Sequence, residues 1–146
     1  MAAKTWDEYY ADVLRLKDRI GDWRPDTICP VMLGGMYPGM ILAKEFGVKD
    51  VRPIDIERKG AERRLAYDVH GGMSGKKVLI VEDDMPTGKG PAMVREMFRH
   101  RGAADVRIAS VYITEESANV ADFYAELCGR LPDYPYKRQN RGDRLR

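Results

Sequence analysis

The spacing of apolar positions along the chain predicts alternating helices and buried strands. Apolar residues recur with a helical period over 6–20, and Thr5 and Glu8 have the spacing of a capping box at its start. Two further helices are expected over 37–46 and about 89–101, and a glycine directly follows each. Three well-defined helices are therefore expected.

Four short apolar runs have the length and composition of buried strands, and they cover 26–32, 51–56, 77–82 and 105–114. Residues 57–76 are polar, charged and glycine-rich without a period, which is typical of a long loop that can include a hairpin. A weaker helical pattern covers 118–128. This order predicts an α/β fold with a central, mainly parallel sheet flanked by helices.

Composition fits one domain with one core, since the 146 residues are 44% hydrophobic and 33% charged. No apolar run approaches the roughly 20 residues of a membrane span, and the N-terminal residues do not read as a signal peptide. Cys29 and Cys128 lie in apolar settings without Cys-x-x-Cys spacing. We therefore expect reduced thiols, a cytoplasmic protein and no membrane partner.

The net charge is unevenly distributed. The chain carries +2 in total and its last ten residues carry five bases against one acid, or +4, so the other residues sum to −2. We expect a single domain over 1–136 and a disordered basic tail over 137–146. Such a tail can bind nucleic acid, but no aromatic residue follows Tyr136, and a nucleic-acid partner is not expected.

Residues 78–90 carry the strongest chemical signal. Four apolar residues lead into Glu82 and Asp83, and after a short gap Thr87-Gly88-Lys89-Gly90 precedes a helical pattern. Backbone N–H groups and the positive end of a helix can hold a phosphate. The two carboxylates face the same opening and can bind hydroxyls or a metal ion.

Three other patterns share part of this segment. A response-regulator receiver domain also has an apolar strand and an acid pair, but near its chain start and without a Thr-Gly turn at this distance. A Walker A loop is excluded because Lys77 follows Gly75-Lys76, where Ser or Thr is needed. An ordinary buried strand that ends in two solvated acids stays open.

A second glycine turn, with Gly34 and Gly35, follows the first expected strand. Paired glycines let the backbone approach a ligand closely, although a simple tight turn would also explain them. A ligand of a parallel sheet lies outside the carboxyl ends of the strands. This turn, the loop 57–76 and residues 82–90 all fall at those ends.

Residues 78–90 resemble the phosphoribosyl-pyrophosphate motif of the type I phosphoribosyltransferases, which has an apolar strand, two acids, two or three variable residues and Thr-Gly. Residues 33–36 and the run Ile41-Leu42-Ala43-Lys44-Glu45-Phe46-Gly47 are similar to the pyrophosphate loop and helix of the xanthine-guanine and hypoxanthine-guanine members. The runs 122–124 and 131–136 resemble the end of those enzymes. The resemblance covers most of 5–136 and implies the family fold with a small C-terminal hood segment.

The resemblance implies a role for each part of the site. Glu82 and Asp83 would bind the ribose hydroxyls and Mg²⁺, the expected cofactor, and Asp84 is a candidate for proton transfer. The 5′-phosphate would lie against Met85, Pro86, Thr87, Gly88, Lys89 and Gly90. The pyrophosphate would lie against Leu33, Gly34 and Gly35. The base would lie near Thr114 and Tyr134, and the chain would form a homodimer.

Three positions depart from the family pattern. Pro86 replaces the acid that precedes Thr-Gly in purine enzymes, and proline cannot exchange a proton. Leu33 replaces a cation near the pyrophosphate. Cations of the 57–76 loop would supply that charge on closure, namely Lys59, Arg63 or Arg64. Glu115 follows Thr114 where purine enzymes hold the exocyclic oxygen with a lysine, and an acid there favours a donor-rich base edge such as an amino group.

The preferred interpretation is a Mg²⁺-dependent pentosyltransferase that moves phosphoribose from phosphoribosyl pyrophosphate to a purine-like base and releases pyrophosphate. The alternative is a non-catalytic regulator that senses phosphoribosyl pyrophosphate or a nucleotide, which the residues at Leu33 and Pro86 and the basic tail support. A hydrolase that handles the phosphoribosyl group is a third interpretation. Turnover distinguishes the first two, because a regulator binds without releasing pyrophosphate.

Overall fold

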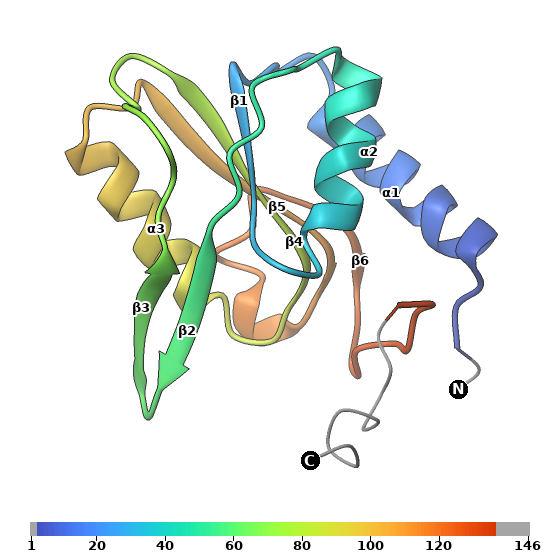
Figure 1. The fold of residues 1–146 in the computed structure, drawn as a ribbon. Helices are drawn as coiled ribbons and strands as arrows, with labels where there is room; N and C mark the ends of the chain where they lie inside the picture. Colours follow the sequence, from blue (N-terminus) through green and yellow to red (C-terminus); the bar gives the residue numbers. More distant parts are fainter. Residues whose placement is uncertain (1–2, 137–146) are drawn as a thin grey trace.

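The computed structural model describes residues 3–136. Its centre is a four-stranded sheet in the order β1-β4-β5-β6, and all neighbouring strands run parallel. The strands are β1 (Thr27–Pro30), β4 (Lys77–Met85), β5 (Asp105–Ile113) and β6 (Phe123–Leu127). Helices α1 (Trp6–Ile20) and α2 (Met36–Phe46) cover one face, and α3 (Lys89–His100) covers the other (Figure 1). The expected α/β fold with a parallel sheet flanked by helices is confirmed.

Strand β4 shows why the sequence pattern is a continuous apolar run. Leu79 and Val81 belong to the core beneath α1 and α2, whereas Val78 and Ile80 belong to the core beneath α3. A parallel strand with helices on both faces buries every side chain, so no polar alternation remains.

Helix α1 starts as its capping box predicts. The Thr5 hydroxyl accepts a hydrogen bond from the Glu8 N–H at 3.1 Å, and the Glu8 carboxylate accepts one from the Thr5 N–H at 2.9 Å. This reciprocal pair satisfies two N–H groups that have no partner within the helix.

The expected helix over 118–128 is wrong. A short 3₁₀ turn, η1 (Glu115–Ser117), is followed by β6, which pairs with β5 from Ala109–Phe123 to Ile113–Leu127. The pairing energy of an edge strand comes from its neighbour, so it overrides a weak local helical preference.

Within the expected strand over 51–56, residues 51–54 form two isolated bridges and residues 55 and 56 begin a separate strand. Val51 bridges to Ile28 and Ile54 bridges to Val31, both parallel and on the outer side of β1. Pro30 of β1, which lies opposite Arg52 between the two bridges, has no N–H to donate, so the ladder is interrupted there.

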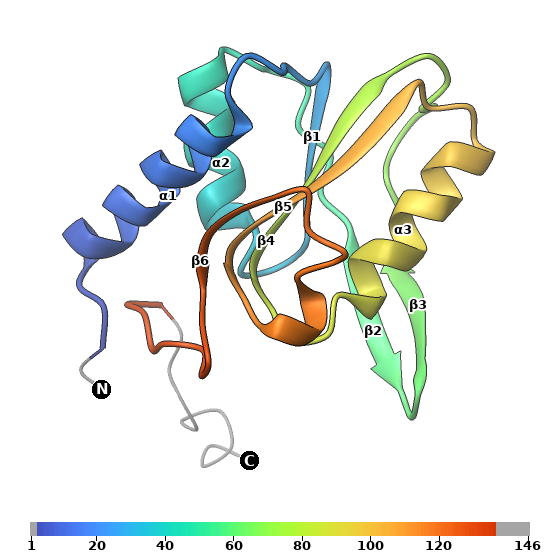
Figure 2. The same cartoon turned by 180° about the vertical axis from the view of Figure 1, so that it is seen from behind.

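Much of the expected loop over 57–76 is an antiparallel hairpin of β2 (Asp55–Lys59) and β3 (Glu62–Tyr67). It projects beside the start of α3, apart from the main sheet (Figures 1 and 2). Ile56 and Leu65 form a cross-strand pair and pack against the core beneath α3. One face of the hairpin is thereby held against the domain.

After β6 the chain runs back past the N-terminal segment, where the Lys4 N–H donates to the Asp133 carbonyl at 2.8 Å (Figure 2). The Tyr134 side chain is buried among Tyr9 and Tyr112, so this C-terminal segment is part of the core. The basic tail expected over 137–146 lies outside the described residues. No helix within residues 3–136 has the length and apolar character needed to cross a bilayer.

Candidate active site

The glycine turn after β1 lies directly on the acidic end of β4. A Cβ atom on Gly34 would stand 1.9 Å from Asp83 Oδ2, and one on Gly35 would stand 2.3 Å from the Val81 carbonyl oxygen. Neither position has room for a side chain, so only glycine permits this approach. The peptide bond between Met32 and Leu33 in this turn is cis.

The three acids lie within β4 and do not project freely from its end. Glu82 and Asp84 pair in register with Ser110 and Tyr112 of β5, and all three acids are partly buried. Burial raises the pKa of the Glu82 carboxyl well above its usual range, and the nearby Asp83 and Asp84 charges raise it further. The strand end thus concentrates negative charge that a cation or a cationic ligand would relieve.

Two tyrosines of the C-terminal segment contact these acids. The Tyr134 hydroxyl lies 2.5 Å from Asp84 Oδ2 and 3.1 Å from Asp83 Oδ2. The Tyr136 hydroxyl lies 3.4 Å from both Asp83 Oδ2 and the Gly34 carbonyl oxygen, and 2.7 Å from the Tyr9 hydroxyl. Burial, followed by the Asp83 and Asp84 charges, raises the pKa of Tyr134, so its hydroxyl stays a donor.

The turn before α3 has the geometry expected of an anion site. The Thr87 hydroxyl accepts a hydrogen bond from the Lys89 N–H at 3.2 Å, and Gly88 adopts a φ of +78° that only glycine adopts readily. A Cβ atom on Gly90 would stand 3.2 Å from the Ile56 side chain of the hairpin. The N-cap residue Gly88 has no side chain to bind the N–H groups that follow Lys89. The first N–H groups of α3 can therefore bind an anion.

These elements surround one cavity of about 290 Å³, which we call the acidic cavity. It collects the expected residues Gly34, Glu82, Asp83, Asp84 and Met85 to Gly90, together with Arg58 and Arg63 of the hairpin. Three segments that are separated in the sequence thus meet at one place: the glycine turn, the hairpin, and the run from the end of β4 to the start of α3.

Only one of the three expected hairpin cations lines the acidic cavity. Arg63 lies there with Arg58, its direct cross-strand partner. The pleat places this pair on the face of the hairpin that packs against the domain, whereas Arg64 pairs with Glu57 on the opposite face. Lys59 shares that opposite face.

Leu33 lies on the other side of the glycine turn. Its side chain is 77% exposed and lines a second cavity of about 360 Å³, the aromatic cavity, with Tyr37, Tyr134 and Tyr136. Asp83 and Asp84 border both cavities. The sequence indicated Tyr134 but missed Tyr136, Tyr9 and Arg58 as site residues. The available signal in the sequence was the pair of tyrosines that flank Pro135, whose hydroxyls contact the acids of β4.

Thr114 lies in a third cavity of about 560 Å³, which is lined by Pro86, Thr114, Glu115, Glu116, Leu127, Cys128 and Gly129. We call it the glutamate cavity. The Thr114 hydroxyl donates a 2.7 Å hydrogen bond to the Pro86 carbonyl, and Pro86 lines the acidic cavity as well. The two cavities therefore share a wall.

The acid cluster fits a magnesium ion that is shared with a substrate. Among residues 3–136 no group of three or more His, Cys, Asp and Glu side chains is placed to form a metal cage. Magnesium in nucleotide sites usually binds one or two carboxylates, water and substrate phosphates. Glu82 and Asp83 offer such carboxylates beside an anion-binding turn.

A parallel sheet with this acidic strand end, glycine turn and helix start is the fold of the type I phosphoribosyltransferases, and the chain shares that fold. The structure is similar to that of a purine phosphoribosyltransferase from Pyrococcus horikoshii, with a TM-score of 0.83 and 26% identity over 91% of each chain. It shares the fold of the Helicobacter pylori xanthine-guanine-hypoxanthine phosphoribosyltransferase, with a TM-score of 0.79, 15% identity and coverage of 97% of this chain and 96% of that one.

A curated relative is the orotate phosphoribosyltransferase of a Sulfurovum species. It is 36% identical over 88 residues, which are 59% of this chain and 41% of that protein, so the chain spans less than half the length of this relative. No family model matches the sequence. The solved structures named above are purine phosphoribosyltransferases and this relative is an orotate enzyme, so the comparisons leave both purine and pyrimidine bases open.

Proposed function

We propose that this protein transfers phosphoribose from phosphoribosyl pyrophosphate to a purine-like base and releases pyrophosphate. One observation carries the proposal. The Gly34 backbone lies against the Asp83 carboxylate in the same cavity as the start of α3. Places for a diphosphate, ribose hydroxyls and a 5′-phosphate are thus adjacent, in the order in which one phosphoribosyl pyrophosphate molecule carries them.

Each part of the acidic cavity has a binding task. The N–H groups from Thr87 to Gly90 hold the 5′-phosphate at the positive end of α3. Glu82 and Asp83 accept hydrogen bonds from the ribose hydroxyls. The turn over Gly34 and Gly35 offers backbone to the pyrophosphate, because no side chain stands in the way.

In the reaction, the bond from the anomeric carbon to the pyrophosphate oxygen breaks and a bond to a ring nitrogen of the base forms. Positive charge develops on the ribose and negative charge on the leaving group. The carboxylates of Glu82, Asp83 and Asp84 stabilise the first, and the guanidinium groups of Arg58 and Arg63 stabilise the second. When bound, Mg²⁺ supplies Lewis-acid stabilisation of the leaving phosphate oxygens.

The base loses a proton as the new bond forms. Asp84 is our candidate acceptor, because it borders the acidic cavity and Pro86 has no group that takes a proton. The 2.5 Å hydrogen bond from Tyr134 fixes the Asp84 carboxylate. Tyr134 therefore acts as a positioning residue for Asp84. The base itself does not need to contact Tyr134.

Pyrophosphate release tests this function. Purified protein would be incubated with Mg²⁺ and phosphoribosyl pyrophosphate, together with one nucleobase at a time, and both pyrophosphate and the new nucleotide would be measured. We expect stoichiometric formation of the two products with at least one base. Tight binding of phosphoribosyl pyrophosphate without turnover would favour the regulator, which the exposed Leu33 at the usual place of a cation supports.

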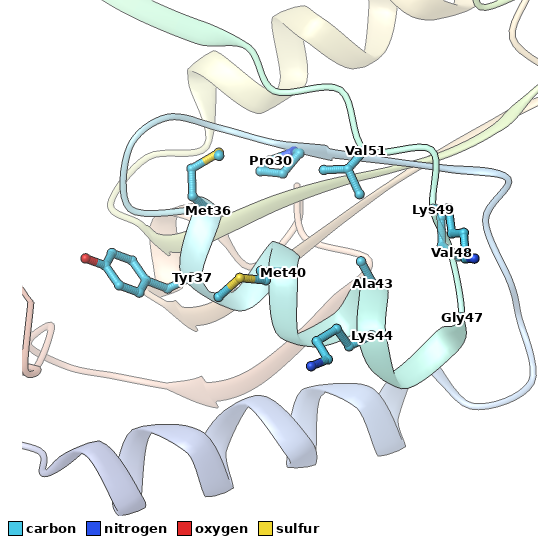
Figure 3. A pocket seen from close by; sticks show the side chains of 10 residues that line it. All are labelled: Pro30, Met36, Tyr37, Met40, Ala43, Lys44, Gly47, Val48, Lys49 and Val51. Atoms are coloured by element: carbon cyan, nitrogen blue, oxygen red, sulfur yellow. The ribbon is translucent and has the colours of Figure 1, made fainter.

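We further propose a homodimer formed through the outer surface of α2. An apolar cavity of about 580 Å³ opens there, and the side chains of Met36, Tyr37 and Met40 on the helix line it (Figure 3). Met40 is 58% exposed, and Val51 adds apolar surface beside it. A second copy would cover this surface symmetrically. Sedimentation equilibrium would detect the dimer, and Met40→Glu should dissociate it.

A cytoplasmic location is also part of the proposal. Cys29 and Cys128 are buried and unpaired, which fits a reducing compartment. Fractionation of cells that express the tagged protein would test this location.

A further inference from the structure

The glutamate cavity, which we call the slot from here on, adjoins the acidic cavity at Pro86. Pro86 borders it on the side of the acidic cavity, and Leu127, which is 47% exposed, borders it on the side of β6. Both offer aliphatic surface, on which a heteroaromatic ring packs well. Because Pro86 lines both cavities, a ring attached to a ribose in the acidic cavity can extend into this slot.

The hydrogen-bonding side chains of the slot present acceptors to a ligand. The single hydroxyl proton of Thr114 is donated to the Pro86 carbonyl at 2.7 Å, so only lone pairs of this oxygen remain for a ligand. The Cys128 thiol is directed at Glu126, at 3.5 Å from Oε2, and burial helps to raise its pKa to about 11. The thiol therefore stays protonated at neutral pH, and its proton is directed at Glu126 and not at a ligand.

The negative charge of the slot also favours a ligand that donates hydrogen bonds. Glu115 and Glu116 lie on the 3₁₀ turn η1 and line the cavity, and ionised carboxylates only accept hydrogen bonds. None of the seven lining residues is Lys, Arg or His. A keto oxygen in this slot would face like partial charge and other acceptors, whereas an amino group would donate to them.

We propose that the slot selects a base with an exocyclic amino group, a 6-aminopurine and not a 6-oxopurine. This inference rests on the proposed function and names the class of its acceptor. The Thr114 hydroxyl, Glu115 and Glu116 determine the choice, since they accept from the amino edge. The slot lies beside the acidic cavity and does not overlap the three acids of β4.

Binding of two product nucleotides tests the inference without requiring turnover. Adenosine 5′-monophosphate and inosine 5′-monophosphate share the ribose 5′-phosphate and differ at the amino or keto edge of the base. Calorimetry with Mg²⁺ should show that the adenosine nucleotide binds at least tenfold more tightly. Ribose 5-phosphate has no base to place in the slot, so it should bind more weakly than adenosine 5′-monophosphate.

Variants assign the preference to the slot. In Glu115→Gln/Glu116→Gln each amide can donate as well as accept, so the preference should fall to less than threefold while the affinity for ribose 5-phosphate is unchanged. Glu45→Gln/Glu96→Gln removes two carboxylates on α2 and α3 outside the slot and should keep the full preference. This control accounts for the change in overall charge.

The possible outcomes separate the two proposals. Ribose 5-phosphate binding combined with equal or tighter binding of the inosine nucleotide overturns the amino-base inference and leaves the proposed function standing. A protein that binds neither ribose 5-phosphate nor phosphoribosyl pyrophosphate overturns the proposed function and this inference with it. An unchanged preference in Glu115→Gln/Glu116→Gln also overturns the assignment to these residues.

Discussion

The Tyr134 hydroxyl and the Asp84 carboxylate, fifty positions apart in the sequence, are joined by a 2.5 Å hydrogen bond. The bond ties the C-terminal segment to the end of β4. The Tyr134 ring stacks on Tyr9 and Tyr112, with centroids 5.6 Å and 5.4 Å away, so the donor is held firmly. The geometry of the candidate site therefore depends on a segment outside its glycine turn and its helix start.

Replacing Tyr134 with Phe removes this donor and keeps the stacked ring. We expect the variant to lose about 1.5–3 kcal/mol of stability, the usual contribution of a hydrogen bond to a charged group. Turnover should fall by about tenfold or more, since Asp84 is no longer fixed. Urea unfolding and kcat measure the two effects. Tyr10→Phe, at an exposed position on α1, is the control and should change neither.

Glu82 and Asp83 should contribute to the affinity for the ribose of the substrate. A charge-assisted hydrogen bond contributes about 1.5–3 kcal/mol, so Glu82→Gln/Asp83→Asn should weaken binding of phosphoribosyl pyrophosphate by about tenfold or more. Titration calorimetry in Mg²⁺ provides the measurement. Asp18→Asn on α1 serves as the control at a distance from the site. Unchanged affinity in the double variant would count against ribose binding by these two residues.

Stability without ligand should depend on pH through Glu82. Burial holds the pKa of the folded carboxyl well above its usual value of 4.5, so folding favours its protonated form. That contribution is complete below about pH 4.5 and is lost as the pH rises through the folded pKa, hence wild type should lose stability toward neutral pH. Glu82→Gln should remove this loss. Melting temperatures of the two proteins between pH 5 and 8 would show it, and parallel curves would contradict it.

The two faces of the hairpin provide a matched pair of variants. Arg58→Gln/Arg63→Gln removes the cations that line the acidic cavity, and Lys59→Gln/Arg64→Gln removes the same charge from the opposite face. We expect the first to lower kcat by about tenfold to a thousandfold, which corresponds to roughly 1.4–4 kcal/mol of transition-state stabilisation. The second should retain kcat within about threefold, a change of under 1 kcal/mol. Equal effects would show that proximity to the cavity is irrelevant.

Local chemistry made much of the site predictable from sequence. Residues 78–90 and the turn at Gly34 and Gly35 each contain their whole signal within a few positions, because a strand, a turn and a helix start are adjacent in the chain. The parallel sheet could therefore be predicted before the structure, and the candidate acids and the candidate phosphate-binding turn could be proposed.

Contacts that depend on tertiary register could not be assigned in this way. Arg58 was overlooked because the choice between hairpin faces depends on which residues pair across the strands. The edge strand β6 was mistaken for a helix because its pairing energy resides in β5. The bond from Tyr134 to Asp84 joins segments whose separation in sequence gives no hint of contact.

The contact between Gly34 and Asp83 links two positions that are distant in the chain. A methyl group at position 34 would overlap the carboxylate at position 83, so an alanine there requires a shorter residue at 83 or a displaced turn. Substitutions at the two positions should therefore occur together among related sequences. A designer who wishes to reshape the turn would have to alter the strand end in the same step.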